Sequence, residues 1–115
     1  MNWIPLLNEQ QVEEVKTKSS DAPQVIFKHS TRCGTSSIAK NRLEKNKAAQ
    51  AAPFYFVDVI RFRSLSNKIA SDFGIRHQSP QILIIKNGIC IYNESHNGIN
   101  IEDIRINLVG TGMTG

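Results

Sequence analysis

Two short β-rich runs enclose a helical pattern in the first half of the chain. The run at Gln24–His29 is mostly apolar, which is typical of a buried strand, and Phe54–Val59 is a second such run. Between them, from Ser36 to about Lys47, apolar positions recur at helical spacing, and those expected to face inward are Ile38, Ala39 and Leu43. Strand, helix and strand in this order predict a βαβ unit with parallel strands and a right-handed crossover.

A helix is predicted on each side of this unit. Asn8 is a favoured N-cap residue with Gln11 three positions on, which resembles a capping box, so a first helix should run from there to about Thr17. A second flanking helix is expected from about Ser64 to Phe73, with Gly74 as the residue that ends it. Its expected inward positions are Leu65, Ile69, Ala70 and Phe73.

The last part of the chain carries a hairpin signal. Gln81–Lys86 and Ile89–Tyr92 are apolar runs separated by Asn87-Gly88, and this pair favours a type I′ turn because both turn positions need a positive φ. A final helix is expected from Ile101 to about Val109, and residues 110–115 are expected to fray.

Together these elements predict an α/β fold in which a small mixed sheet carries helices on both faces. The order is helix, βαβ unit, helix, hairpin and helix. With 115 residues, the chain fits one domain spanning residues 1–115.

Composition narrows the possible functions. Fourteen Lys and Arg against ten Asp and Glu give a net charge of +4, but the basic residues are scattered, so we expect no nucleic-acid partner. No apolar run is long enough for a membrane helix and no signal peptide is visible, so we expect a cytoplasmic protein without a membrane partner. Two cysteines are too few for a cysteine zinc site, and we expect no metal and no bound cofactor.

Cys33 is the candidate for chemistry. It falls where a predicted strand meets a helix N-terminus, where unpaired backbone N–H groups and the helix dipole stabilise a thiolate. Its neighbours do not look like core residues, and Arg32 among them can add to the positive field. They are Thr31, Arg32, Gly34 and Thr35. We therefore expect a reactive cysteine rather than a small buried one.

A lowered thiol pKa would help Cys33 most as a leaving group. A shift from about 8.5 to about 6.5 raises the thiolate fraction at neutral pH, but the intrinsic nucleophilicity falls, so attack gains only a few-fold. A thiol of low pKa leaves a disulfide faster. This suits an enzyme that takes up a small thiol as a mixed disulfide and is then released by a second thiol. A Cys33 pKa at or above the ordinary value would remove this basis.

Three segments resemble the thioredoxin pattern, in which a cis-proline precedes the fourth strand. They are Phe73-Gly-Ile-Arg76 and Ser79-Pro80, followed by Lys86-Asn-Gly88. More narrowly, Lys28-His-Ser-Thr-Arg-Cys33, His77-Gln-Ser-Pro-Gln81 and Ser95-His96 resemble the YtxJ family, the monothiol bacilliredoxins. The similarity extends from about Trp3 to Leu108.

The resemblance implies a thioredoxin-like fold and removal of bacillithiol from S-thiolated cytosolic client proteins. Cys33 matches the attacking cysteine of the family and Pro80 its cis-proline. One departure is visible: the chain reads Cys33-Gly-Thr-Ser36 where Pro-Ile is expected between Cys and Ser in much of the family. Glycine makes this loop more flexible and bears on the redox poise and on the preferred low-molecular-weight thiol.

The other candidate site residues follow from their positions relative to Cys33 and Pro80. Ser36 takes the place of a second cysteine, so no intramolecular disulfide can close; its hydroxyl either donates to the thiolate or serves ordinary helix N-terminal chemistry. The groups expected to bind substrate are Arg32, Gly34, Thr35, Ser79, Pro80 and His96. A surface role is as plausible for His96, and more so for His77. Cys90 lies beside the hairpin turn, about 20 Å from the Pro80 end, too far for a disulfide.

Two other functions remain open from the sequence. Ser30-Thr-Arg-Cys33 loosely resembles the Thr-x-x-Cys of peroxiredoxins, but the preceding proline is missing and the chain is short for that scaffold. A peroxidase would lose its thiol rapidly and stoichiometrically with peroxide. A thioredoxin fold that binds peptides without turnover is the second alternative, and comparing wild type with Cys33→Ser on a thiolated protein separates it from an enzyme.

Overall fold

The computed structural model describes residues 3–32, 34–45 and 52–109. Cys33 and the predicted fraying of residues 110–115 lie outside these ranges. In chain order the elements are β1 (Trp3–Pro5), α1 (Glu9–Lys18), β2 (Gln24–His29), α2 (Gly34–Lys45), β3 (Phe54–Asp58), α3 (Arg63–Phe73), β4 (Gln81–Lys86), β5 (Ile89–Ser95), the 3₁₀ turn η2 (His96–Gly98) and α4 (Ile101–Val109).

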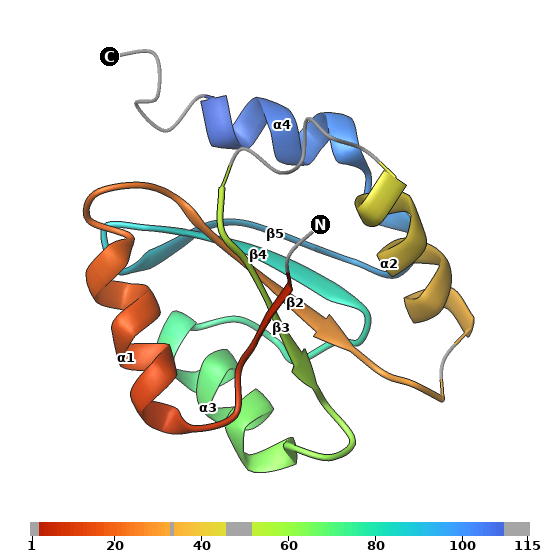
Figure 1. Ribbon diagram of the computed structural model, residues 1–115, viewed down its shortest axis with the longest axis horizontal. Coiled ribbons are helices and arrows are strands. Elements are labelled where there is room, and N and C mark those ends of the chain that lie inside the picture. Colours follow the sequence, from red (N-terminus) through yellow and green to blue (C-terminus); the bar gives the residue numbers. More distant parts are fainter. Residues whose placement is uncertain (1–2, 33, 46–51, 110–115) are drawn as a thin grey trace.

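These strands form one mixed sheet in the order β1-β3-β2-β4-β5 (Figure 1). β1 and β2 both run parallel to β3, whereas β4 is antiparallel to β2 and to β5. The parallel pairing of β2 and β3 on either side of α2 confirms the predicted βαβ strand arrangement. The turn between β4 and β5 has φ of 54° at Asn87 and 77° at Gly88, as the type I′ prediction requires.

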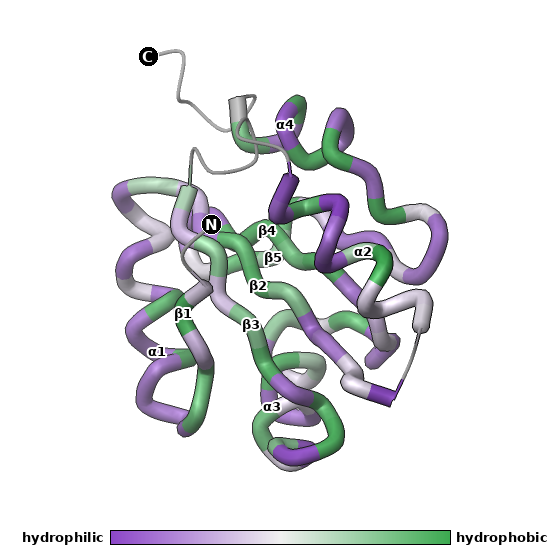
Figure 2. Tube along the Cα trace, turned by 45° about the vertical axis from the view of Figure 1, so that its right-hand side comes forward, coloured by the Kyte–Doolittle hydropathy of each residue, from purple (hydrophilic) through white to green (hydrophobic). Residues whose placement is uncertain are grey.

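Helices cover both faces of the sheet, which confirms the predicted fold class. α1 and α3 pack over one face, with a core that includes Val12, Val15 and Ile69. α2 and α4 pack over the other face. The core there includes Leu43, Ile104 and the alternate strand residues of β2 and β4. In Figure 2 the mostly hydrophobic strands lie between helices in which hydrophobic and hydrophilic residues follow one another along the chain.

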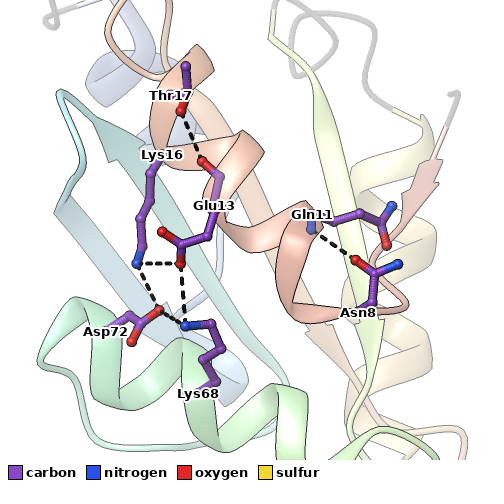
Figure 3. A network of polar contacts seen from close by, with 7 residues as sticks. All are labelled: Asn8, Gln11, Glu13, Lys16, Thr17, Lys68 and Asp72. Carbon is purple, nitrogen blue, oxygen red and sulfur yellow. Dashed lines mark hydrogen bonds and ion pairs between the residues drawn. The ribbon is translucent and has the colours of Figure 1, made fainter.

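The two helices on the first face are joined by an ion network (Figure 3). Lys16 on α1 lies 2.8 Å from Asp72 on α3, and Lys68 reaches the same carboxylate at 2.8 Å. Glu13 accepts from both lysines. All four side chains are partly exposed, so the network contributes little stability beyond fixing how α1 lies on α3.

The start of α1 confirms the predicted N-cap with one change. The Asn8 side chain accepts from the Gln11 backbone N–H at 3.0 Å (Figure 3). The Gln11 side-chain oxygen accepts from the Leu7 N–H at 2.6 Å, whereas a capping box uses the N-cap residue's own N–H. Gln11 also donates to the Pro5 carbonyl, so it ties β1 to α1.

The structure departs from the sequence prediction at two elements. β1 was not predicted, because three residues that end in proline carry no strand periodicity; proline is tolerated there because β1 is an edge strand. In α2, Ile38 is 54% exposed rather than inward. The buried stripe of this helix is Ser36, Ala39 and Leu43, so a serine takes the place of the first apolar residue.

Candidate functional site

The candidate site lies where β2 ends and β4 begins. The last paired residues of these antiparallel strands are Lys28 and Gln81. At this end of the sheet the chain leaves β2 through His29 and Ser30 and continues into α2. The loop after α3 reaches the same end and enters β4 through Pro80. Cys33, the predicted attacking residue, lies between these segments in the sequence but outside the described residues.

Ser36 is a buried anchor at the start of α2. Its side chain is fully buried. Its Oγ accepts from the Ser30 backbone N–H at 3.0 Å and lies 2.7 Å from His29 Nδ1. The serine that replaces a second cysteine thus links the first turn of α2 to the end of β2.

His29 is a site residue that the sequence reasoning missed. Its ring is 8% exposed and stacks on Phe27 at a centroid distance of 5.9 Å. Burial lowers the pKa of His29; the nearby Lys40 lowers this pKa further, while Asp58 and Glu44 oppose the shift. The imidazole is therefore neutral at neutral pH. No linear motif relates His29 to Ser36, since their contact depends on how α2 docks on β2.

The peptide bond between Ser79 and Pro80 is cis, as the resemblance implied. The Pro80 carbonyl accepts from the His96 backbone N–H at 2.9 Å. The Ser79 hydroxyl oxygen is buried and has no hydrogen-bond partner among the described residues. A buried hydroxyl without a partner carries a desolvation cost.

His96 returns to the Pro80 end of the sheet, as predicted. His96 follows β5 and is the first residue of η2, where its φ is 53°. Its Nε2 lies 2.9 Å from the Gln78 side-chain oxygen. η2 packs against α2, so the exposed His96 ring belongs to the same end of the molecule as Ser36.

The three predicted binding residues next to Cys33 are at least partly accessible to solvent. Arg32 and Gly34 are exposed and Thr35 is half-buried. A Cβ added to Gly34 would meet nothing within 4 Å. Gly34 is the first residue of α2, so Cys33 directly precedes a helix in the chain, as predicted.

The comparison with protein families decides the identity. The model of the monothiol bacilliredoxin family, BrxC, matches residues 4–104. The chain belongs to this family. Its family and its fold are those of thiol–disulfide oxidoreductases. The described residues include no group of three or more His, Cys, Asp or Glu that could hold a metal.

Solved structures agree with the assignment of this chain to the bacilliredoxin family. A protein with a thioredoxin fold, provisionally assigned as an oxidoreductase, is 28% identical with a TM-score of 0.79, and the match covers 89% of each chain. The thioredoxin Mala s 13 of Malassezia sympodialis is 23% identical with a TM-score of 0.71, and the match covers 96% of this chain and 90% of that one. Fasciola hepatica thioredoxin is 17% identical with a TM-score of 0.71, and the match covers 94% of this chain and 98% of that one. The last two show the fold alone.

Two further residues of this bacilliredoxin have structural surroundings. Cys90, near the hairpin turn, donates its thiol hydrogen to the Tyr92 carbonyl at 3.2 Å, and burial raises the pKa of that thiol. A raised pKa disfavours the reactive thiolate, in agreement with the predicted structural role. His77 is an exposed loop residue, which agrees with the surface role that the sequence favours for it, and its Nδ1 lies 3.0 Å from the amine of the buried Lys28. Among the described residues no helix has both the length and the apolarity needed to cross a bilayer.

Proposed function

We propose that this protein is a monothiol oxidoreductase that removes a low-molecular-weight thiol, bacillithiol, from S-thiolated client proteins in the cytosol. The observation that carries the proposal is the family match together with Ser36, which occupies the position of a second cysteine. Ser36 is buried and hydrogen-bonded to Ser30, so the first turn of α2 offers no resolving thiol.

The proposed reaction has two disulfide exchanges. The Cys33 thiolate attacks the sulfur of the small thiol in the client's mixed disulfide, and the client cysteine leaves as a thiolate that takes a proton from water. Cys33 then carries the small thiol as a mixed disulfide. A second molecule of the small thiol attacks that adduct as a thiolate, forms the symmetric disulfide and releases Cys33 as a thiolate.

The residues on either side of Cys33 and Pro80 support the roles proposed for them in this reaction. Gly34 opens α2 directly after Cys33, and a helix N-terminus favours the thiolate that leaves in the second exchange. The exposed His96 ring, at the same end of the sheet as Pro80, suits binding of a polar substrate. Arg32 and Thr35 complete the proposed binding rim. Cys90 is left out, because its thiol is engaged with Tyr92.

A dethiolation assay tests the proposal. A client protein carrying bacillithiol on one cysteine is incubated with bacillithiol and with wild type, Cys33→Ser or Cys90→Ser, and release is followed by mass spectrometry. We expect wild type and Cys90→Ser to release the thiol at equal rates and Cys33→Ser to match the uncatalysed rate. Equal release by wild type and Cys33→Ser would reject the enzyme and favour a peptide-binding module.

The same assay with glutathione- or coenzyme A-modified client tests the choice of co-substrate. Faster release of bacillithiol supports the proposal, whereas a preference for one of the other thiols would correct it. Rapid consumption of peroxide by the reduced protein would instead indicate a peroxidase.

A further inference from the structure

A side chain of the loop between α3 and β4, His77, ties residues 74–80 to the interior of the protein. His77 is an exposed residue, but its Nδ1 lies 3.0 Å from the amine of Lys28 on β2. That amine also donates to the Ser66 carbonyl of α3 at 3.1 Å. The Ser66 hydroxyl lies 3.2 Å from the same ring nitrogen. One nitrogen of the loop therefore contacts both a strand and a helix.

The contact with Lys28 requires a His77 ring that carries no hydrogen on Nδ1. A charged lysine amine has three hydrogens to donate and no lone pair to accept with, so Nδ1 must be the acceptor. In the imidazolium both ring nitrogens carry hydrogens. Two positive groups would then face one another at hydrogen-bond distance. The contact with a charged Lys28 can therefore exist only while His77 is neutral.

We propose that the contact between Lys28 and His77 is a pH-sensitive latch on the loop at residues 74–80, closed while His77 is neutral and released when His77 takes up a proton. The loop is the part that moves. Lys28 is fully buried on β2, which is paired with a strand on each side, so the sheet holds its amine in place. His77 lies on the surface, where water can solvate an imidazolium.

The surroundings of the His77 ring give the latch its direction. Burial lowers the pKa of His77 most, and the positive charges of Lys28 from β2 and Arg63 from α3 lower it further. A released ring in water returns to the ordinary pKa of about 6.5. The released loop therefore binds a proton more readily than the latched loop, and a falling pH favours release.

The latched loop carries Ser79 and Pro80, which are expected to bind a client protein. Two hydrogen bonds accompany its closed form. The Gln78 N–H donates to the Gln81 side-chain oxygen at 3.3 Å, and the His96 N–H donates to the Pro80 carbonyl at 2.9 Å. These two amides report whether the loop is closed. In the proposed function, release in mild acid would weaken client binding, but the latch itself involves no thiol.

Amide hydrogen exchange, followed by NMR in the full chain at pH 7 and pH 5, tests the latch. Rates are corrected for the intrinsic pH dependence of exchange, and the amides of β2 and β4 serve as the reference for unfolding of the whole domain. The protection of the Gln78 and His96 amides should fall by about threefold or more at pH 5. The ceiling is about 25-fold, for a latched His77 that stays neutral and a released one with the ordinary pKa of 6.5.

Three variants identify the group that responds to pH. His77→Gln keeps an oxygen that accepts from Lys28 and cannot titrate, so its two reporter amides should be equally protected at both pH values. Lys28→Met removes the donor, and protection should be low at both pH values. His96→Asn is the control, because the His96 ring contacts the same loop at Gln78, and this variant should keep the pH-dependent loss. Circular dichroism would confirm that each variant is folded.

The outcomes decide for or against the latch without reference to the thiol chemistry. Equal protection of the reporter amides at pH 5 and pH 7 in the wild type would overturn it. An equal loss in His77→Gln or in Lys28→Met would assign the change to another group, and an equal loss in the reference strands would assign it to global unfolding; either result overturns the latch. No client or small thiol is present, so a failed dethiolation assay would leave the latch standing, and a failed latch would leave the proposed function standing.

Discussion

The amine of Lys28 and the Nδ1 atom of His77 lie 3.0 Å apart, with Lys28 fully buried. The amine also donates to the Ser66 carbonyl at 3.1 Å. A charged lysine offers only donors, so His77 must accept at Nδ1 and carry its own hydrogen on Nε2. Burial lowers the pKa of Lys28 from 10.5 to about 8, and burial followed by the charges of Lys28 and Arg63 lowers the pKa of His77.

The Lys28 shift predicts that stability rises in mild alkali. Between about pH 8 and 10.5 the unfolded chain holds a proton on Lys28 that the folded chain has released, so the free energy of unfolding increases with pH. The full shift corresponds to about 3 kcal/mol. Urea unfolding at pH 7.5 and pH 10 should show a larger increase in the free energy of unfolding for wild type than for Lys28→Met. An equal increase in the two proteins would contradict the lowered Lys28 pKa.

The two lowered histidine pKa values predict a loss of stability in mild acid. The pKa values of His29 and His77 are both lower in the folded state than the ordinary 6.5. As pH falls below about 6.5, the unfolded chain takes up protons first, and the folded state loses stability. The melting temperature should fall from pH 7 to pH 5, and it should fall less in His77→Gln, which keeps an oxygen to accept from Lys28. An unchanged pH dependence in that variant would exclude His77 as a contributor.

Removing the Ser36 hydroxyl should destabilise the fold. Ser36→Ala leaves the Ser30 N–H and His29 Nδ1 without their partner inside the protein, which costs about 1–3 kcal/mol. The adjacent Ser37 is exposed on the same helix, so Ser37→Ala is the matched control and should change the stability by less than about 0.5 kcal/mol. Chemical denaturation of both variants measures the difference, and an equal effect would show that Ser36 is not an anchor.

Placing a proline at position 34, where the resemblance leads us to expect one in much of the family, should stabilise the protein. Gly34 is the first residue of α2, where proline is favoured, and its Cβ position is empty. Fixing this residue reduces the entropy of the unfolded chain, so Gly34→Pro is expected to add about 0.4–1 kcal/mol. Thermal unfolding of Gly34→Pro beside Gly34→Ala measures this gain. A lower melting temperature for both variants would mean that the loop needs glycine.

The elements that could be predicted from the sequence are those with local signals. The Asn87-Gly88 turn and the Asn8 cap depend on residues within a few positions of one another, and both were placed correctly. β1 has no such signal, because its three residues become a strand only by pairing with β3. Ile38 was misplaced because a buried serine, Ser36, occupies the inward position of its helix.

The candidate site could be predicted only in part, because some of its contacts have a local signal in the sequence and others arise only from tertiary packing. The return of His96 to Pro80 followed from the hairpin register, since Gln81 pairs with Ser95. The role of His29 did not, because its contact with Ser36 arises from the docking of α2 on β2. The Lys28–His77 pair joins β2 to the loop after α3 across 49 positions. Each residue begins one of the motifs that carry the family resemblance, but nothing in the sequence shows that they are in contact.

The proposed function requires that this family member handles a small thiol with a single cysteine. Intact-mass spectrometry after mixing the reduced protein with bacillithiol-modified client, followed by peptide mapping, tests it most directly. We expect one bacillithiol adduct on Cys33, none on Cys90, and a client freed of its modification. A client that loses its modification while Cys33 remains unmodified at every time point, or an adduct on Cys90 alone, would contradict it.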